Sequence, residues 1–330
     1  MIKKYTVVIL LFFLISNSNV FADQQKYYDV SFLKNYSEVQ KALKFEGFKE
    51  IYFKTPDSLR INGFFLEREN ATCNVVVCAG WLPGRKEEMA TFFATLPSYC
   101  NILLFDARGH GKSEGPLFSQ VWKYGVHEYK DIIGAIRYVN MRNVLPVIVC
   151  GICSGAFNAA HAIFALENKN LLSKCNVKGL IFDSGWGSIL KISRTVAIGG
   201  SDKRISLILK NLLGNNFRII RSSLLYKLIF TTVKCSINII HKLLLSHFVK
   251  PYELRTNLFN KCKETQVSFL FIHSYNDLYA DIHDAQKLAS LIPNKECWWI
   301  KKGSYHACHH LKKKELYQEK VKLFIDKLLA

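Results

Sequence analysis

Short apolar runs and longer amphipathic segments alternate along most of the chain. The first two runs, Phe48 to Lys54 and Ile61 to Glu67, are separated by the turn signal Pro56-Asp57-Ser58 and predict an antiparallel hairpin. Six further runs are short and predominantly apolar, which predicts buried strands: Asn74 to Ala79, Ile102 to Asp106, Pro146 to Gly151, Gly179 to Asp183, Val267 to His273 and Cys297 to Lys301.

Segments of helical length lie between and after these runs. Arg85 to Leu96, Tyr124 to Asn140 and Ser154 to Asn168 are predicted helices. The C-terminal segment is amphipathic, with lysines on one face and these apolar residues on the other: Tyr317, Val321, Phe324, Ile325 and Leu328. The alternation predicts an α/β protein whose mostly parallel sheet is covered by helices on both faces. Ligands of such sheets bind at the carboxyl ends of the strands, where we therefore expect the chemistry.

The alternation is interrupted between residues 186 and 252. This stretch holds several apolar, helix-length runs and 11 Lys or Arg residues, and Asp202 is its only acidic residue. We therefore predict a first core part at 23–185, a helical insertion at 186–252 that covers the strand ends as a lid, and a second core part at 253–330. The apolar and cationic surface of the insertion is compatible with packing on the core alone or with additional contact with lipid.

Residues 1–22 have the pattern of a secretory signal peptide. Lys3 and Lys4 precede an apolar run from Thr6 to Ile15, and Val20-Phe21-Ala22 places small residues at positions −3 and −1 of a cleavage site. An uncleaved anchor is the alternative, but the run is shorter than the roughly 18 to 20 residues that span a bilayer. The sequence therefore predicts an exported protein, periplasmic or secreted, that begins at Asp23.

The chain is strongly basic, with a formal net charge of +19. Removal of Lys3 and Lys4 with the signal peptide leaves 19 − 2 = +17. Export argues against nucleic acid as the partner, so peripheral contact with an anionic membrane surface or with cell-surface polymers is the favoured interpretation. A lysine-rich, solvated surface without a specific partner is the alternative.

Ten cysteines in an exported chain raise the question of disulfides. Cys73 and Cys100 each lie just before one of two strands that should be neighbours. Cys262 and Cys297 bear a similar relation to a later strand pair. Either pair is a candidate disulfide, and ten reduced thiols are the alternative.

The pentapeptide Gly151-Ile152-Cys153-Ser154-Gly155 joins a predicted buried strand to a predicted helix. It has the form G-x-nucleophile-x-G, a sharp strand-to-helix turn that exposes the central side chain. The turn is crowded, so the residues two before and two after the nucleophile must be small. Centring the motif on Cys153 places glycines there, whereas centring it on Ser154 would place Ile152 and Ala156 there. This spacing favours Cys153 as the nucleophile, with a core cysteine in a glycine turn as the alternative.

A second motif makes the resemblance to a known family clear. Asp106 to Gly115 (DARGHGKSEG) resembles the D-x-R-G-x-G-x-S turn that follows the fourth strand of α/β-hydrolases. The chain is most similar to the serine-aminopeptidase and monoacylglycerol-lipase-like branch of that superfamily, over roughly residues 48–185 and 262–330. The resemblance implies an α/β-hydrolase fold with a mostly parallel eight-stranded sheet, flanking helices and a helical lid. In it, Arg108 is expected to hold Asp106 or nearby carbonyls, and His110 is not expected to be catalytic.

The resemblance also implies an oxyanion hole. Ala79-Gly80-Trp81 corresponds to the family's His-Gly-x segment at the end of the third strand. The backbone N–H groups of Trp81 and Ser154 would then bind the oxyanion. Ala79 in place of His is a departure from the family pattern, because it removes a side chain that often braces this loop.

Family members carry the acid and the base after late strands. Asp277 follows the seventh strand in His273-Ser274-Tyr275-Asn276-Asp277 and is the favoured acid, with Asp183 at the end of the sixth strand as the alternative. Asp281 and Asp284 are expected to cap the next helix or to carry surface charge.

The base follows the last strand. Gly303-Ser304-Tyr305-His306 corresponds to the family's G-x-x-H turn, which favours His306 over the nearby His309 and His310.

Together these residues predict a Cys-His-Asp triad. Asp277 would orient His306, His306 would take the proton of Cys153, and the thiolate would form an acyl-enzyme that water hydrolyses. The family usually carries Ser as the nucleophile, and dienelactone hydrolase is its familiar member with Cys. We therefore expect an esterase or thioesterase for acyl or lipid-like substrates, without a cofactor or metal. A catalytically silent fold that binds a lipid or protein, and an acyltransferase, are the alternatives.

Overall fold

The computed structural model describes residues 36–80, 84–116, 125–192, 231–232, 235–236, 239, 252, 255–262 and 265–330. The predicted signal peptide at 1–22, Trp81 of the predicted oxyanion hole and nearly all of the predicted lid lie outside these residues. The division of the chain into core, lid and core therefore stays a prediction. None of the described helices combines the length and the apolar composition that crossing a membrane requires.

The described residues form one eight-stranded sheet, in which every strand predicted from the sequence is present. Its order is β1-β2-β4-β3-β5-β6-β7-β8. β1 and β2 form the predicted antiparallel hairpin, β2 also runs antiparallel to β4, and all other neighbours are parallel. The bounds are Lys49–Lys54 (β1), Arg60–Leu66 (β2), Cys73–Cys78 (β3), Cys100–Phe105 (β4), Val147–Ile152 (β5), Val177–Asp183 (β6), Ser268–Ser274 (β7) and Lys295–Ile300 (β8).

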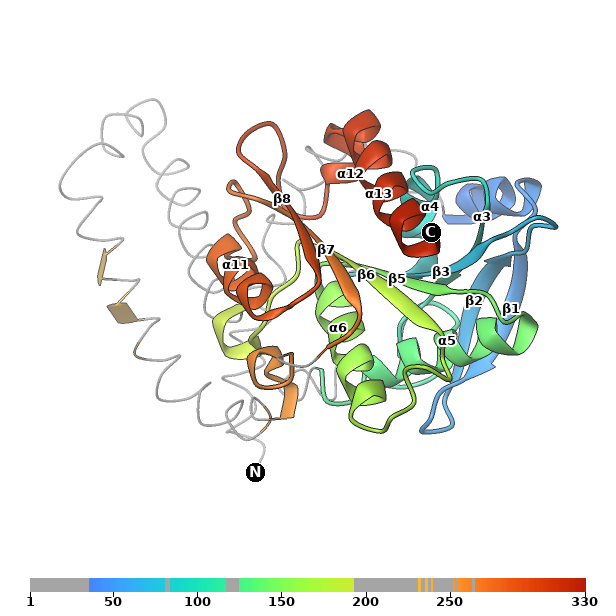
Figure 1. Ribbon diagram of the computed structural model, residues 1–330, viewed down its shortest axis with the longest axis horizontal. Coiled ribbons are helices and arrows are strands. Elements are labelled where there is room, and N and C mark those ends of the chain that lie inside the picture. The colour runs from blue at the N-terminus through green and yellow to red at the C-terminus, as the bar shows by residue number, and fades with distance from the viewer. Residues whose placement is uncertain are drawn as a thin grey trace, which may run out of the picture.

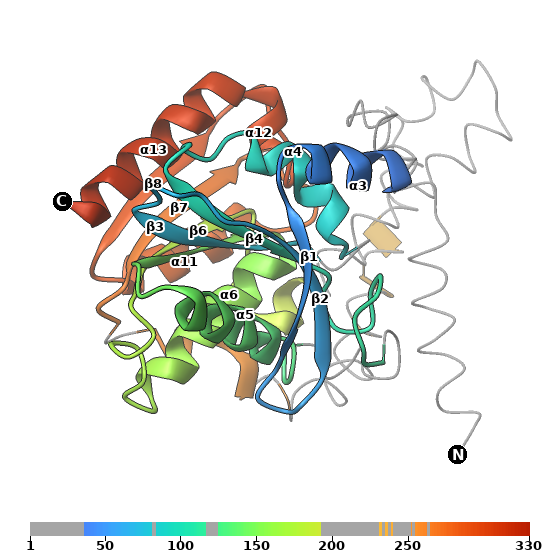
Figure 2. The same cartoon turned by 90° about the vertical axis from the view of Figure 1, so that its right-hand side faces the viewer.

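Helices cover both faces of the sheet (Figures 1 and 2). One face carries α3 (Tyr36–Phe45), α4 (Ala90–Phe93), α12 (His309–Lys312) and α13 (Lys314–Leu329). The other carries α5 (Tyr129–Arg142), α6 (Ser154–Glu167) and α11 (Ile282–Leu291). Two short 3₁₀ turns lie at Lys86–Met89 and Leu258–Asn260.

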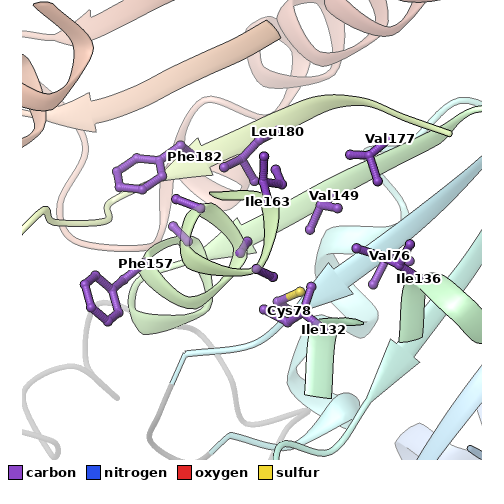
Figure 3. Close-up of a cluster of buried hydrophobic side chains, with 14 of the residues drawn as sticks. Val76, Cys78, Ile132, Ile136, Val149, Phe157, Ile163, Val177, Leu180 and Phe182 are labelled. Carbon is purple, nitrogen blue, oxygen red and sulfur yellow. The ribbon is translucent and has the colours of Figure 1, made fainter. Parts of the chain in front are cut away.

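Each face of the sheet has its own hydrophobic core. Figure 3 shows the core beneath α5 and α6, where Ile132 and Ile163 face strand residues such as Val149. The opposite core lies beneath α13 and α4 and includes Phe324 and Phe92. The inner strands β2 to β7 are almost wholly buried, which explains why their sequences are apolar runs rather than alternating patterns. The edge strands β1 and β8 are partly exposed.

The prediction of a single helix from Arg85 to Leu96 is wrong in its first part. The chain instead makes a 3₁₀ turn followed by the four-residue α4. The Asp106 carboxylate holds this turn, because it accepts hydrogen bonds from the backbone N–H and from Nζ of Lys86, at 3.0 and 2.8 Å. A buried contact to a carboxylate 20 residues away thus decides the local helix type.

Arg108 does not bind Asp106, contrary to the expectation from the motif. Its guanidinium donates to Asp131, with a shortest distance of 2.7 Å, and to Asp57, at 3.0 and 3.1 Å. The backbone N–H of Arg108 also donates to Asp131, at 2.9 Å. Arg108 therefore ties the turn after β4 to α5 and to the β1–β2 turn, while Lys86 neutralises Asp106.

Asp284 is buried rather than a surface charge. Its carboxylate accepts hydrogen bonds from the backbone N–H of Gly187 at 2.7 Å and from Nζ of Lys191 at 2.6 Å. The carbonyl of Gly187 in turn accepts from the backbone N–H of Leu258 at 3.0 Å. The start of the predicted insertion is thus fastened to α11 and to the beginning of the second core part. Asp281 caps α11 as expected, since it accepts from the backbone N–H of His283 at 3.0 Å.

We expect Phe324→Ala on α13 to lower the free energy of unfolding by about 3–5 kcal/mol, because it opens a cavity against the sheet. Phe324 is 2 % exposed, whereas its neighbour Leu323 is 54 % exposed. The matched control Leu323→Ala should change the free energy by less than about 0.5 kcal/mol. Urea denaturation of both variants measures the difference, and similar losses would contradict the described packing of α13.

Candidate active site

Cys153 lies at the sharp turn between β5 and α6. Its backbone has φ 58° and ψ −122°, a region that residues with a Cβ rarely adopt. The backbone N–H of Cys153 donates to the carbonyl of Asp183 at 2.8 Å, which fixes the turn to the end of β6. Strain of this kind persists only where the surrounding structure imposes it.

The two glycines of the motif are sterically required. A Cβ on Gly155 would lie 2.2 Å from the carbonyl oxygen of Cys78, and one on Gly151 would lie 2.4 Å from Cα of Ala156. Real Cβ atoms do not approach backbone so closely, so neither position accepts a side chain without moving β3 or α6. The crowding lies two residues to each side of Cys153, where the sequence motif places it.

The side chains of Cys153 and Ser154, which are adjacent in the turn, differ in their exposure to solvent. The Cys153 side chain is half-buried at the edge of the sheet and contacts both hydrophobic cores. Ser154 is 1 % exposed, and its hydroxyl has no hydrogen-bond partner among the described residues. The Cys153 sulfur is therefore the more accessible of the two side-chain atoms, while the Ser154 hydroxyl is enclosed.

The structure brings Cys153, His306 and Asp277 together. His306 Nδ1 lies 2.7 Å from Asp277 Oδ2, and the Cys153 and His306 side chains are hydrogen-bonded to each other. Asp277 follows β7, and His306 follows β8, so all three residues lie at the carboxyl ends of their strands. The imidazole thus stands between a carboxylate and a thiol, the order that proton transfer from the thiol requires.

The side chain of Asp277 is fully buried, and both oxygens of its carboxylate have hydrogen-bond partners. Oδ1 accepts from the backbone N–H groups of Tyr279 and Ala280, each at 2.9 Å. Oδ2 lies 2.7 Å from Nδ1 of His306 and 3.2 Å from Nε2 of His273. Burial alone would raise the pKa of Asp277, but the charge of His306 and the hydrogen bonds from His273 and His306 hold it well below the ordinary value. The residue is therefore a carboxylate at neutral pH.

The contact with Asp277 also shifts the pKa of His306. Burial alone would lower the pKa of His306, but attraction from Asp277 and Cys153 and the hydrogen bonds to both raise it well above its ordinary value. Because its pKa is raised, the His306 imidazole can hold a proton taken from the Cys153 thiol. His306 therefore has the environment of a thiol-activating imidazole.

Asp183, the alternative acid, points to a different imidazole. Its Oδ1 accepts from the Ser184 hydroxyl at 2.8 Å and lies 3.4 Å from His309 Nε2, while its Oδ2 accepts from the Tyr317 hydroxyl at 2.9 Å. His309 Nδ1 lies 2.6 Å from the Ser304 hydroxyl oxygen. Asp183 therefore belongs to a buried polar network and not to the His306 pair.

This network holds the loop that carries the base. The Ser184 hydroxyl accepts from the backbone N–H of Ala307 at 2.9 Å, next to His306. The hydroxyl of Ser274 on β7 donates to the carbonyl of Ser304 at 2.8 Å. Contacts on both sides of His306 thus fix its backbone. His310 lies apart from the site, with Nε2 3.3 Å from the Thr91 hydroxyl.

Of the two residues predicted to form the oxyanion hole, the structure describes only Ser154. A Cβ on Gly80 would lie 3.6 Å from the Cys153 sulfur, so the segment after β3 passes directly beside the nucleophile. Ser154 is the first residue of α6, and a first-turn backbone N–H has no partner within its own helix. Trp81 lies outside the described residues, and its role stays a prediction. His110, expected to be non-catalytic, packs against Gly84.

Sequence reasoning did not identify the supporting residues of the site. His273 donates to Asp277, and Ser184, Ser304 and His309 anchor the base loop. A signal existed, because polar residues directly follow or end the apolar strands β6 and β7. Their partners lie up to 134 residues away, as in the hydrogen bond of Tyr317 with Asp183, so the pairing itself could not be read locally.

No protein-family model and no curated protein matches the sequence. Many solved structures match the fold, and hydrolases of several kinds are among them. An esterase of Pyrococcus furiosus has 17 % identity and a TM-score of 0.57 over 88 % of this chain and 94 % of its own.

Two further solved structures with the same fold are described as other kinds of enzyme. A proline iminopeptidase of Mycobacterium smegmatis has 12 % identity and a TM-score of 0.56, over 85 % of this chain and 99 % of its own. An enol-lactonase of Burkholderia xenovorans has 14 % identity and a TM-score of 0.53, over 84 % and 100 %. The predicted fold is thus confirmed: the chain has the α/β-hydrolase fold, with an antiparallel edge on an otherwise parallel sheet.

We expect Asp277→Asn to lower the pKa of His306 well below its wild-type value. The neutral amide removes the larger of the two attractions that oppose burial and leaves only that of Cys153. In the wild type, His306 should stay protonated well above the ordinary histidine pKa of about 6.5. NMR titration of the His306 ring measures both values. Asp183→Asn is the control and should leave the titration near wild type; equal shifts in the two variants would contradict Asp277 as the partner.

Proposed function

We propose that the chain hydrolyses ester or thioester bonds through Cys153, His306 and Asp277. One observation carries the proposal: an imidazole bound to a buried carboxylate on one side and to a strained, accessible thiol on the other. A cysteine that served only packing would require neither a backbone at positive φ nor a glycine two residues to each side. The α/β-hydrolase fold places such a turn where other members act on their substrates.

The first half of the reaction forms an acyl-enzyme. His306 takes the proton of the Cys153 thiol, and the sulfur attacks the carbonyl carbon of the substrate. The carbonyl oxygen becomes an oxyanion, which the backbone N–H of Ser154, together with that of Trp81, would stabilise. The intermediate then collapses, and the leaving alcohol or thiol departs with the proton held by His306.

The second half regenerates the enzyme. His306 takes a proton from a water molecule, whose oxygen attacks the thioester carbon of acyl-Cys153. The carboxylic acid leaves, and the proton stays on His306 beside the restored Cys153 thiolate, as in the resting pair. Asp277 stays ionised throughout and stabilises the imidazolium in both halves.

The thiol and its surroundings favour an acyl ester or thioester over a peptide. The acyl-enzyme is itself a thioester, so its formation from a thioester or an activated ester is nearly balanced, whereas its formation from an amide is uphill. Three apolar or aromatic side chains within two positions of Asp277 or His306 in the sequence are exposed: Tyr275 (48 %), Leu278 (58 %) and Tyr305 (40 %). They offer an apolar surface to an acyl chain. The esterase and enol-lactonase of the same fold are consistent with this choice.

We expect Cys153→Ala to reduce kcat for a short p-nitrophenyl ester by about 10³-fold or more, because the nucleophile is lost. Ser154→Ala removes only an enclosed hydroxyl and should keep most of the activity. Steady-state kinetics of both variants, with mass detection of an acyl group on Cys153, test the mechanism.

Retention of activity in Cys153→Ala would overturn the assignment of the nucleophile. A folded wild type that is inactive on esters and thioesters would favour the catalytically silent alternative, and ester formation with an added alcohol would favour an acyltransferase.

We also propose that the protein is exported and contacts anionic lipid from the outside of the cytoplasmic membrane. The N-terminal pattern of residues 1–22 and the net charge of +17 that remains after its removal support this. N-terminal sequencing of protein from the exported fraction should begin at Asp23. The purified protein should sediment with anionic vesicles at low salt and release at high salt, because surface charge is screened. An unprocessed cytosolic chain, or no preference for anionic over neutral vesicles, would contradict the two parts respectively.

A further inference from the structure

Two cysteines meet at the amino-terminal ends of neighbouring strands. Cys73 begins β3, Cys100 begins β4, and the two residues are in-register Cα partners. Their sulfur atoms are 3.3 Å apart, and both residues are fully buried. The other pair suggested by the sequence differs, because Cys262 is buried and Cys297 is exposed. The structure therefore distinguishes between two pairings that the sequence left equal.

The backbone around the pair is held on both sides. The backbone N–H of Thr72 donates to the carbonyl of Tyr99 at 2.9 Å, and the side chain of Asn101 donates to that of Asn74 at 3.0 Å. Paired strands lie about 4.7–4.9 Å apart. This separation falls within the Cα range of about 4.4–6.8 Å that disulfides span. Side-chain rotation alone therefore suffices to join the sulfurs.

We propose that Cys73 and Cys100 form a disulfide when the chain folds in an oxidising compartment. The oxidant is a disulfide, either glutathione disulfide or the active-site disulfide of an oxidoreductase. One thiolate attacks it and forms a mixed disulfide, and the second thiolate displaces the donor sulfur. The protein loses two hydrogen atoms, and the donor disulfide is reduced to two thiols.

The bond forms before the core closes. Neither sulfur is accessible in the folded chain, so a soluble oxidant meets them only while β3 and β4 are pairing. In the folded protein, the hydrogen bond with Cys73 and burial raise the pKa of Cys100 far above its ordinary value, which keeps the reactive thiolate scarce. Folded, reduced protein should therefore resist oxidation at this pair.

The disulfide would stabilise the fold without entering the chemistry. It closes a loop of 27 residues between β3 and β4, which restricts the unfolded chain. The pair begins these two parallel strands, whereas Cys153 follows the carboxyl end of β5 in the same parallel set. Oxidation of the pair should therefore leave the nucleophile unaffected.

Refolding of the full chain in a glutathione redox buffer tests the proposal. Cys153→Ser, Cys235→Ser and Cys297→Ser remove the accessible thiols that could exchange. Non-reducing peptide mapping by mass spectrometry should recover the Cys73–Cys100 peptide pair, lighter by two hydrogen atoms than the reduced peptides. Cys78 and Cys150 supply the matched control, because both are buried on the neighbouring strands β3 and β5 but are one position out of register. They should stay reduced.

A stability measurement distinguishes a disulfide between Cys73 and Cys100 from non-covalent packing of the two thiols. Cys73→Ser should lower the urea midpoint of oxidatively refolded protein substantially more than that of protein kept in reductant. Absence of the cross-linked peptide, cross-linking of Cys78 to Cys150 to the same extent, or an equal shift with and without reductant would overturn the proposal. None of these readouts depends on catalysis, so the result stands apart from the proposed hydrolase activity.

Discussion

The active site depends on the close approach of the first turn of α6 to the end of β3. Gly155 lies against the carbonyl oxygen of Cys78 at a distance that leaves no room for a Cβ, and Gly151 lies equally close to Ala156. Because the helix begins so near the sheet, Cys153 is forced to a positive φ and its sulfur faces outward at the strand end. The same approach brings Gly80 beside the sulfur, so the end of β3 and the strand-to-helix turn at Cys153 are positioned together.

The base is positioned by two layers of polar contacts around that sulfur. Asp277 contacts His306 directly and is itself saturated by two backbone N–H groups and His273. Behind it, Ser184 and Ser304 hold the backbone on either side of His306. A buried carboxylate beside an imidazole is stable only when its remaining lone pairs are bound, which this arrangement achieves. The polar network under the loop is therefore part of the site, although it does not touch the thiol.

The two ends of the parallel strands serve different purposes. Residues that act on a substrate gather at the carboxyl ends, where loops can vary without disturbing the sheet. The amino-terminal ends of β3 and β4 instead carry close side-chain contacts between strands, namely the Asn74–Asn101 hydrogen bond and the Cys73–Cys100 thiols. Covalent or polar reinforcement at that end stabilises the sheet at a distance from the chemistry.

The sequence by itself determined the strands and the cramped strand-to-helix turn at Cys153. These features are local: buried strands require continuous apolar runs, and a cramped turn requires glycines two residues to each side of Cys153. The tertiary structure alone decided the partners. It paired Arg108 with Asp131 and Asp57 rather than with Asp106, buried Asp284, assigned Asp183 to His309 and Asp277 to His306, and set Cys73 against Cys100. Such contacts join residues far apart in the chain, so which of several equivalent charges or thiols meet depends on how the strands and helices pack, and no local pattern records it.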